Sequence, residues 1–347
     1  MAIPTEPIGS VPRPAELLAG LNDQNAVGEL VDQALTDTIQ RFEATGSPVV
    51  TDGEQGKSSF VTYPIGPPTT YEPDGAVIPF ADGHTRQLPR LAAGPFQYAA
   101  TSSQYLVKAR TLTDRPVKQA VIAPSALSLL YPADGIADYP REKFLEDLVN
   151  ETEADIRGSL DAGAHVVQID FTEGRLSLKL DPSGGLLKSF VELINHVVDR
   201  FSDEEKQRLG LHTCPGGDLD STHSLDVDYA GLLPDLFQVH VGNFYVQLAS
   251  ETDPDRVLRI IAEHLPANAR VFVGVTDPID PRVESAEEVR DRVLKAAEHI
   301  PVDQLGTCDD CGFSPFADDT STSRDIAFAK ITARVEGTKL ASEALGV

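Results

Sequence analysis

Residue types that bind soft metals lie in two short motifs, His212-Thr-Cys214 and Cys308-Asp-Asp-Cys311. Leu209 and Leu211 predict a short buried strand before the first motif, and Pro215-Gly-Gly217 predicts a turn after it. Because side chains alternate along a strand, His212 and Cys214 are expected on the same side. An imidazole and a thiol placed in this way can form half of a zinc site. The alternative for this pair alone is a core histidine beside a buried free cysteine.

Zinc is the metal that this donor set favours, because Mg²⁺ and Ca²⁺ prefer oxygen ligands. His212, Cys214 and Cys311 give three ligands. Cys308 as the fourth would make a closed, structural site, whereas Gln247 or a substrate group would leave that position exchangeable, as catalytic zinc requires. We favour the exchangeable site, since structural zinc normally lies on a small loop module of its own.

Further polar residues stand where predicted strands end. With the motif residues they are Glu54, Ser125, Asp170, His212, Cys214, Gln247, Asp277, Cys308 and Cys311. In a parallel α/β barrel the carboxyl ends of the strands form one face, and that face carries the active site. Each residue alone could be structural, so their shared position is the observation that predicts a site.

The elements that must position these residues follow from apolar spacing. Helices are predicted over about 26–45 and 140–162, and in the segments 186–198, 257–265, 285–294 and 326–335. Strands are predicted at 49–50, 94–98, 119–123, 165–170, 209–214, 236–248 (bent at 242–243), 271–275 and 304–307. Residues 62–92 are rich in Pro, Gly and Tyr and predict a long excursion, with a hairpin as one form, that covers one end of the fold.

A strand followed by a helix, repeated about eight times without a break in composition, predicts a single (β/α)8 TIM barrel over residues 1–347, with an insertion near 62–92. An open doubly wound sheet is the alternative. The first strand is not followed by Gly-x-Gly-x-x-Gly, and the chain has no Gly-Lys-Ser/Thr phosphate loop. These absences argue against nucleotide chemistry.

Composition limits the partners and the compartment. The chain has 347 residues with 54 acidic and 29 basic side chains, a formal net charge of −25, which disfavours nucleic acid and anionic membranes. It has neither an apolar run of the roughly 18–20 residues that span a membrane nor the start of a signal peptide. Three cysteines are too few for a disulfide framework, so we expect a cytoplasmic protein with reduced thiols.

Six motifs occur in the order found in one family: Ile8-Gly-Ser10, Asp52-Gly-Glu54, Gln168-Ile-Asp170, His212-x-Cys214, Asp280-Pro-Arg282 and Asp310-Cys-Gly312. In these motifs the chain resembles the catalytic C-terminal barrel of cobalamin-independent methionine synthases and their short, single-barrel relatives, which include epoxyalkane:coenzyme M transferases. The resemblance runs from about residue 6 to 340. Segments 213–229 and 306–324 are most similar to the short relatives.

The resemblance implies a zinc-dependent barrel that activates a thiol for alkyl transfer. His212, Cys214 and Cys311 would hold the zinc, and Gln247 stands where the family has a glutamate ligand. Backbone groups at Ile8 and Ser10 would bind the carboxylate of the thiol substrate, while Glu54 and Asp170 would bind its ammonium and form the catalytic pair. The implied reaction is methylation of homocysteine to methionine, with 5-methyltetrahydrofolate, a methylcorrinoid carrier protein or a simpler molecule as donor.

Two departures from the family pattern keep other functions open. Gln247 is a weaker ligand than glutamate, and Ile279 replaces a histidine that assists proton delivery to the folate in full-length methionine synthases. The main alternative is addition of coenzyme M to an epoxide, for which Arg175 or Arg282 could bind the sulfonate. A decarboxylase on a related barrel, or a zinc-stabilised binding protein that has lost its donor site, are the others.

Overall fold

The computed structural model describes residues 2–21, 26–66 and 70–347. Its centre is a six-stranded parallel sheet with the strand order β12-β11-β10-β7-β6-β5. The strands are β5 (Gln119–Ile122), β6 (Val167–Asp170), β7 (Leu209–Thr213), β10 (Asn243–Val246), β11 (Arg270–Gly274) and β12 (Leu305–Cys308). Every residue of β5, β6, β7, β10 and β12 is buried, as expected for parallel strands covered on both faces.

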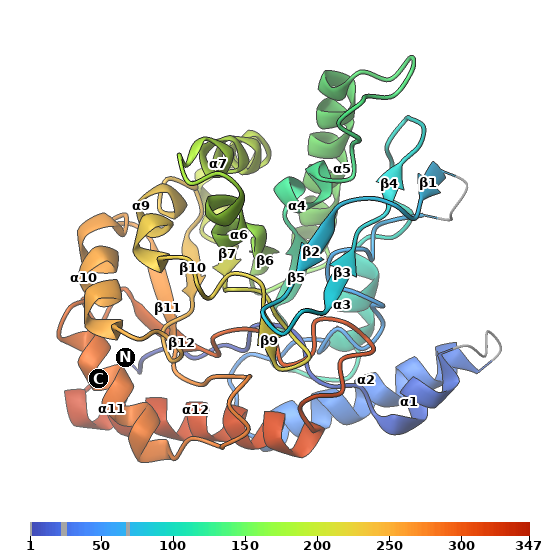
Figure 1. Ribbon diagram of the computed structural model, residues 1–347. Helices are drawn as coiled ribbons and strands as arrows, with labels where there is room; N and C mark the ends of the chain where they lie inside the picture. Colours follow the sequence, from blue (N-terminus) through green and yellow to red (C-terminus); the bar gives the residue numbers. More distant parts are fainter. Residues whose placement is uncertain (1, 22–25, 67–69) are drawn as a thin grey trace.

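Two further segments continue the sheet at its edges through single parallel bridges. Thr5 pairs with Thr307 at the β12 edge, and Val50 pairs with Val117 at the β5 edge. These two segments also contact each other: the backbone N–H of Val11 donates to the Gly53 carbonyl at 3.2 Å. The prediction of a parallel α/β fold is confirmed, in a TIM-barrel-like arrangement of six laddered strands and two bridged segments (Figure 1). The short strand predicted at 49–50 is the bridge at Val50.

Helices cover the outside of the sheet (Figure 1). They are α1 (Ala15–Gly20), α2 (Val27–Ala44), α3 (Ser103–Arg110), α4 (Pro124–Ser128), α5 (Arg141–Asp161), α6 (Glu173–Leu180), α7 (Gly185–Val198), α8 (Asp203–Lys206), η2 (Tyr229–Gly231), α9 (Leu233–Leu236), α10 (Pro254–His264), α11 (Ala286–Ala297) and α12 (Arg324–Leu345). The helices predicted at 26–45 and 140–162 are α2 and α5. On α5, Phe144, Leu148 and Ile156 are buried toward the core.

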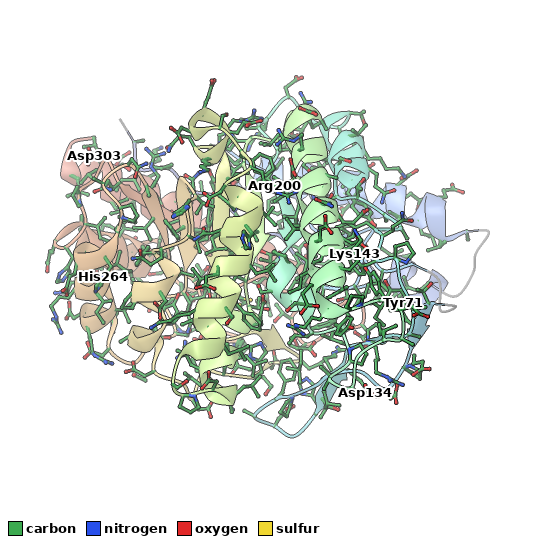
Figure 2. The ribbon with its side chains drawn as sticks, turned by 90° about the horizontal axis from the view of Figure 1, so that it is seen from above. Tyr71, Asp134, Lys143, Arg200, His264 and Asp303 are labelled. Carbon is green, nitrogen blue, oxygen red and sulfur yellow. The ribbon has the colours of Figure 1, made fainter. Side chains whose placement is uncertain are left out.

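Charged side chains lie on the outer faces of these helices. Figure 2 labels Lys143 on α5, Arg200 just after α7 and His264 at the end of α10, on segments far apart in the chain. None of the described helices combines the length and the apolar character needed to cross a membrane.

The excursion predicted at 62–92 is present and contains the predicted hairpin. Strands β2 (Val77–Pro79) and β3 (Thr85–Gln87) pair in antiparallel fashion, and β1 (Tyr71–Glu72) pairs with β4 (Arg90–Leu91). The hairpin reaches a second small ladder, β8 (Gly217–Asp218) with β9 (Ser221–Thr222), where Ala81 N–H donates to the Thr222 carbonyl at 2.9 Å. The excursion therefore lies against the segment that follows β7.

One predicted strand and the first half of another are wrong, whereas the second half of the strand predicted at 236–248 is β10. Residues 236–241 form the end of α9 and a turn, because Pro234 favours the first turn of a helix, and β10 begins only at Asn243. Residues 94–98 form no strand, since the Phe96 N–H donates to the Tyr139 hydroxyl at 2.8 Å instead of to a neighbouring strand. In both places the backbone is not a strand, although its apolar side chains are buried in the core.

Candidate functional site

Three side chains that can hold a metal converge beyond the end of β7. The ligand atoms of His212, Cys214 and Cys311 all lie within 4.8 Å of one another. The two sulfurs are 2.9 Å apart. His212 lies on β7 and Cys214 follows its last residue, so the alternation of side chains brings them to one side, as predicted. Cys311 comes from the loop after β12.

His212 has the hydrogen-bond surroundings expected of a metal ligand. Its Nδ1 lies 3.3 Å from the backbone carbonyl of Tyr245 on the neighbouring strand. A carbonyl only accepts, so Nδ1 would be the donor in this contact, and Nε2 is the ring nitrogen left to bind a metal. Nε2 is buried and has no hydrogen-bond partner within the described part of the chain. A buried acceptor without a partner is costly, and a bound cation would satisfy it.

The two thiols are in hydrogen-bond contact and shift each other's pKa. The hydrogen bond from Cys214 lowers the pKa of Cys311 well below its ordinary value, and the same bond, together with burial, raises the pKa of Cys214 well above it. A cation between the sulfurs would favour the thiolate at both positions. One imidazole and two thiolates, with His212 Nε2 as described, therefore fit a soft or borderline metal ion.

Cys308 does not belong to this group. Its thiol donates to the Phe272 carbonyl at 3.4 Å and packs with Ile8, Tyr245 and Phe272. The metal-binding group found in the described residues does not include it. The closed His-Cys₃ alternative is therefore wrong, because β12 continues through Cys308 and buries it, while Cys311 lies in the loop beyond.

Gln247 lies just after β10, and its amide is already bonded at both ends. Oε1 accepts from Arg175 Nη1 at 3.2 Å. Nε2 donates to Ser250 Oγ and to Glu251 Oε1, both at 2.8 Å. Arg175 also pairs with Glu251 at 2.7 Å. The ligand role of Gln247 remains a prediction. It would require Oε1 to accept a hydrogen bond from Arg175 and bind the metal at the same time.

A pocket opens beside the metal-binding group, with His212 and Cys311 on its wall. At one end it is polar, with Ser10, Glu54, Asp170, His212 and Cys311. Its remaining walls are mainly apolar, with Phe60, Val61, Ile78, Phe80, Leu88, Ala126, Leu129, Leu176, Pro315 and Phe316. The polar end comes largely from strand ends, and much of the apolar end comes from the excursion.

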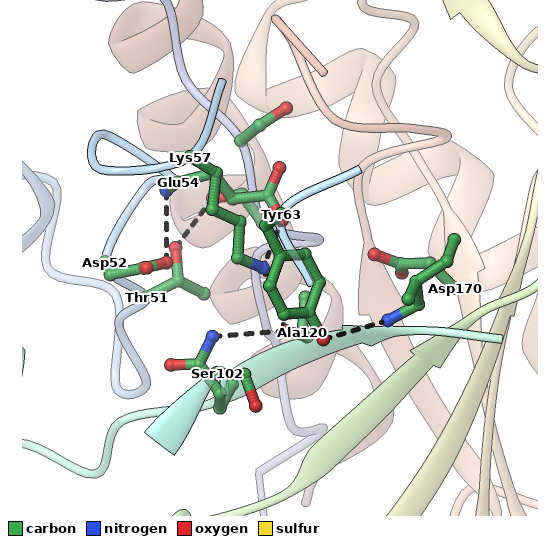
Figure 3. A network of polar contacts seen from close by, with 12 residues as sticks. Thr51, Asp52, Glu54, Lys57, Tyr63, Ser102, Ala120 and Asp170 are labelled. Atoms are coloured by element: carbon green, nitrogen blue, oxygen red, sulfur yellow. Dashed lines mark hydrogen bonds and ion pairs between the residues drawn. The ribbon is translucent and has the colours of Figure 1, made fainter. Parts of the chain in front are cut away.

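Glu54 is held by a buried lysine that the sequence analysis did not identify. Lys57 Nζ donates to Glu54 Oε1 at 3.1 Å and to the Ala120 carbonyl at 2.9 Å, and lies 4.4 Å from the centre of the Tyr63 ring (Figure 3). Burial lowers the pKa of Lys57, but nearby carboxylates, with Glu54 first, outweigh it and raise the pKa overall. A lysine three residues after Glu54 was the available signal.

Asp170 lies at the end of β6, level with His212 on β7. Burial and the negative charge of Glu54 raise its pKa to about 7, although His212 and the Gln168 amide act in the opposite direction. Gln168 Nε2 donates to Asp170 Oδ1 at 2.7 Å. A bound ammonium would favour the ionised form of both pocket carboxylates. The predicted pair therefore meets in one place.

Ile8 and Ser10 also lie on the pocket wall. The Ser10 carbonyl accepts from Phe313 N–H at 2.9 Å, and its hydroxyl accepts from Ser314 N–H at 3.2 Å. A Cβ at Gly312 would lie 2.4 Å from Ser10 Oγ, so glycine is needed for the Cys311 loop to approach this segment. Binding of a carboxylate here remains a prediction.

Other strand-end residues have different places. Ser125 donates a hydrogen bond to Glu173, a pocket residue that the sequence analysis missed. Asp277 caps the turn at Ile279 through an N–H···O bond of 3.0 Å. Arg282 is exposed and pairs with Glu288 at 2.8 Å, away from the pocket.

Comparisons with known proteins agree with this geometry. Residues 3–325 match the family model described as "Cobalamin-independent synthase, Catalytic domain". A methionine synthase from Saccharolobus solfataricus is 25% identical, with 99% of this chain and 96% of that protein covered. One from Pyrococcus furiosus is 22% identical, with 97% and 92% covered. A B12-independent methionine synthase from Shewanella sp. W3-18-1, solved with selenomethionine, has the same fold with a TM-score of 0.76, at 19% identity and full coverage of both chains.

The match to the family model covers nearly the whole chain, and it agrees with the motif order seen in the sequence. A longer relative, a 5-methyltetrahydropteroyltriglutamate–homocysteine methyltransferase from Trichodesmium erythraeum, is 24% identical, with 96% of this chain and 44% of that protein covered. The chain therefore belongs to the cobalamin-independent methionine synthase family and is a transferase.

Proposed function

We propose that the protein methylates a thiol substrate, homocysteine, at a zinc site held by His212, Cys214 and Cys311. The convergence of these three ligands beside Glu54 and Asp170 in one pocket carries the proposal. Zinc, when bound, would lower the pKa of the substrate thiol so that it is a thiolate at neutral pH. We treat residues 1–347 as one catalytic domain that acts in the cytoplasm.

The charges of the pocket favour an ammonium-bearing thiol. Asp170 and Glu54 line its polar end; Lys57 pairs with Glu54 Oε1, and Asp170 has no ion-pair partner among the described residues. Among the described lining residues, Arg86 is the one lysine or arginine, and its guanidinium is paired with Asp218 and Asp318. Arg175 is neutralised by Glu251. The sulfonate of coenzyme M would therefore lack an unpaired cation, which makes homocysteine the better substrate.

The protein's own residues would bind and orient the two reactants. The ammonium lies between Glu54 and Asp170, and the backbone near Ile8 and Ser10 binds the carboxylate, so that the sulfur lies beside His212 and Cys311, where the apolar part of the pocket begins. The donor lies there with its methyl group in line with the sulfur, and the apolar walls exclude water. We take 5-methyltetrahydrofolate or a related small donor, since nothing in the pocket or among the named relatives supports a methyl-carrier protein.

Metal content tests the ligand assignment. Purified protein should hold about one zinc per chain by elemental analysis, and Cys214→Ser or Cys311→Ser should release it. Cys308→Ser is the matched control, because this buried thiol lies outside the ligand group, and it should retain the metal. Full zinc in either ligand variant would refute the site.

X-ray absorption at the zinc edge tests the reaction. Homocysteine should add one sulfur to the coordination shell, whereas coenzyme M should not. An unchanged spectrum with homocysteine, or the same change with coenzyme M, would contradict the proposed substrate.

A further inference from the structure

Glu173 is an acidic residue in the pocket that the proposed reaction has not yet used. It is the first residue of α6, three residues after Asp170, and it lines the pocket with 5% of its surface exposed. Oε1 accepts a hydrogen bond from the Ser125 hydroxyl. Oε2 is buried without a hydrogen-bond partner, and no lysine, arginine or histidine of the described residues lies within ion-pair distance.

Methyl transfer from nitrogen or oxygen needs an acid. As the S–C bond forms and the bond from carbon to the donor atom breaks, the donor atom takes the electron pair and must then gain a proton. Ile279 stands at the turn where the sequence resemblance implies a histidine. A Cβ placed on Gly217 would lie 3.8 Å from Ile279 Cδ1 and 4.0 Å from the Cys311 sulfur. An apolar side chain that cannot give a proton therefore lies near the metal ligands.

We propose that Glu173 is the general acid that protonates the leaving atom of the donor. This inference rests on the proposed thiol methylation. The Glu173 carboxyl gives its proton to the nitrogen or oxygen that leaves, and becomes a carboxylate. The thiol of the next substrate molecule releases one proton when it becomes a thiolate, so the cycle neither gains nor loses protons.

The surroundings of Glu173 keep its carboxyl neutral. Burial raises its pKa to about 8, and the negative charge of Asp170 adds to this effect. The Ser125 hydroxyl and nearby backbone amides act in the opposite direction but are weaker. A carboxyl that is protonated at pH 7 can act as an acid, as an ionised one cannot.

The other titratable groups on the pocket are less suited to this role. Burial, followed by the charges of Lys179 and Arg175, lowers the pKa of His223 to about 4, so its ring carries no acidic proton near pH 7. Asp170 is assigned to the substrate ammonium. Glu173 lines the same pocket as the two substrate-binding carboxylates, close to Asp170, whose charge acts on it, and to the backbone of Ala126.

Infrared difference spectra during a pH titration test the protonation state without any donor. The wild type should show a protonated-carboxyl band that disappears near pH 8 and is missing in Glu173→Gln. In Ser125→Ala the loss of the hydroxyl should move this transition to higher pH, because that hydrogen bond lowers the pKa of Glu173. Absence of a Glu173-dependent band at pH 7 would overturn the proposal.

Kinetics with homocysteine and two kinds of donor test the role. With iodomethane as donor, the leaving iodide needs no proton. With 5-methyltetrahydrofolate or 1,2-epoxypropane, the leaving nitrogen or oxygen needs one. Glu173→Gln should lose about 100-fold more rate with a proton-requiring donor than with iodomethane. In the wild type, the rate with that donor should decline above about pH 8, and Ser125→Ala should shift this decline upward.

Equal losses with both donor types, or a wild type that uses iodomethane but neither proton-requiring donor, would refute the acid role. Failure of the proposed function would look different. In that case homocysteine alkylation by iodomethane would be as fast in Cys214→Ser as in the wild type.

Discussion

Gln247 binds Arg175, Ser250 and Glu251 through both ends of its amide, and this contact pattern predicts its main effect. Gln247→Ala should keep the metal but lower the free energy of unfolding by about 1–3 kcal/mol, because the buried Arg175 and Glu251 lose a partner. Elemental analysis and urea unfolding of the same preparation measure both quantities. Loss of zinc would instead make Gln247 the fourth ligand.

His223 should make the protein sensitive to mild acid. Its pKa is about 4 in the folded protein, where burial disfavours the charged ring, and about 6.5 when unfolded. Between these values the unfolded state binds the extra proton, so stability falls as the pH drops from about 6.5 to 4, by up to about 1.4 kcal/mol per pH unit. Urea unfolding at pH 7 and pH 5 should differ less in His223→Gln than in the wild type.

The control for this comparison is His264→Gln, on the outer end of α10 (Figure 2). This variant should keep the wild-type difference between the two pH values. If His223→Gln also keeps it, His223 is not the group responsible.

At the residue level, spacing predicted the site only where local geometry fixes direction. The strand period places His212 beside Cys214 whatever the rest of the fold. Whether Cys308 joins Cys311 as a fourth ligand depends on where β12 ends, and the pattern of apolar residues does not define that end to one residue. Glu173 at the start of α6 has the composition of an ordinary first helical turn, and only the fold shows that it is buried in the pocket.

At the level of elements, the hairpin β2–β3 covers the pocket and is held by Arg86. Its guanidinium pairs with Asp218 at 2.5 Å and Asp318 at 2.9 Å, and lies 4.2 Å from the Phe316 ring. Among the described residues, Arg86→Ala leaves the fully buried Asp218 side chain with His84 as its one remaining ion-pair partner. It should cost about 2 kcal/mol, raise the KM for the donor several-fold, and speed proteolysis within residues 77–87.

Arg90→Ala is the matched control, because Arg90 lies in the same excursion but pairs with the exposed Glu72 and Asp74. It should change stability by less than about 0.5 kcal/mol and leave the KM unchanged. Equal effects of the two variants would show that the Arg86 contacts do not hold the hairpin.

Elements with a clear period were predictable, and short ones were not. The apolar face of α5 repeats over 21 residues, so its bounds followed from the sequence within a residue or two. Val239 and Val241 lie in a turn with their side chains buried. Because they are two residues apart, they produce the alternating apolar pattern of a strand. In such short segments tertiary burial, and not local preference, decides the backbone.

At the scale of the whole molecule, the C-terminal helix α12 contacts both the N-terminal segment and the loop after β11 (Figure 1). The Ile3 N–H donates to Ser342 Oγ at 3.0 Å. Lys330 Nζ pairs with Glu284 at 2.9 Å, and both side chains are at most 1% exposed. Glu284 in turn accepts from the Asp277 N–H at 2.8 Å, in the loop after β11.

Lys330→Met should therefore lower the free energy of unfolding by about 3 kcal/mol, because among the described residues it leaves the buried Glu284 charge with Arg292, at 3.7 Å, as its remaining ion-pair partner. The double variant Lys330→Met with Glu284→Gln should recover part of the loss. Lys143→Met removes an exposed pair on α5 and should change stability by less than about 1 kcal/mol. Additive effects of the two substitutions in a urea-unfolding cycle would show that the pair does not interact.

The two ends of the pocket come from different parts of the chain: the polar end from strand termini, and much of the apolar end from residues 60–88. Changes in the excursion can therefore alter which electrophile fits without moving the nucleophile. One scaffold can diverge into enzymes that share a sulfur nucleophile and differ in the carbon group they transfer. For protein engineering, a library confined to Phe60, Ile78, Phe80 and Leu88 is the direct route to new donor preferences.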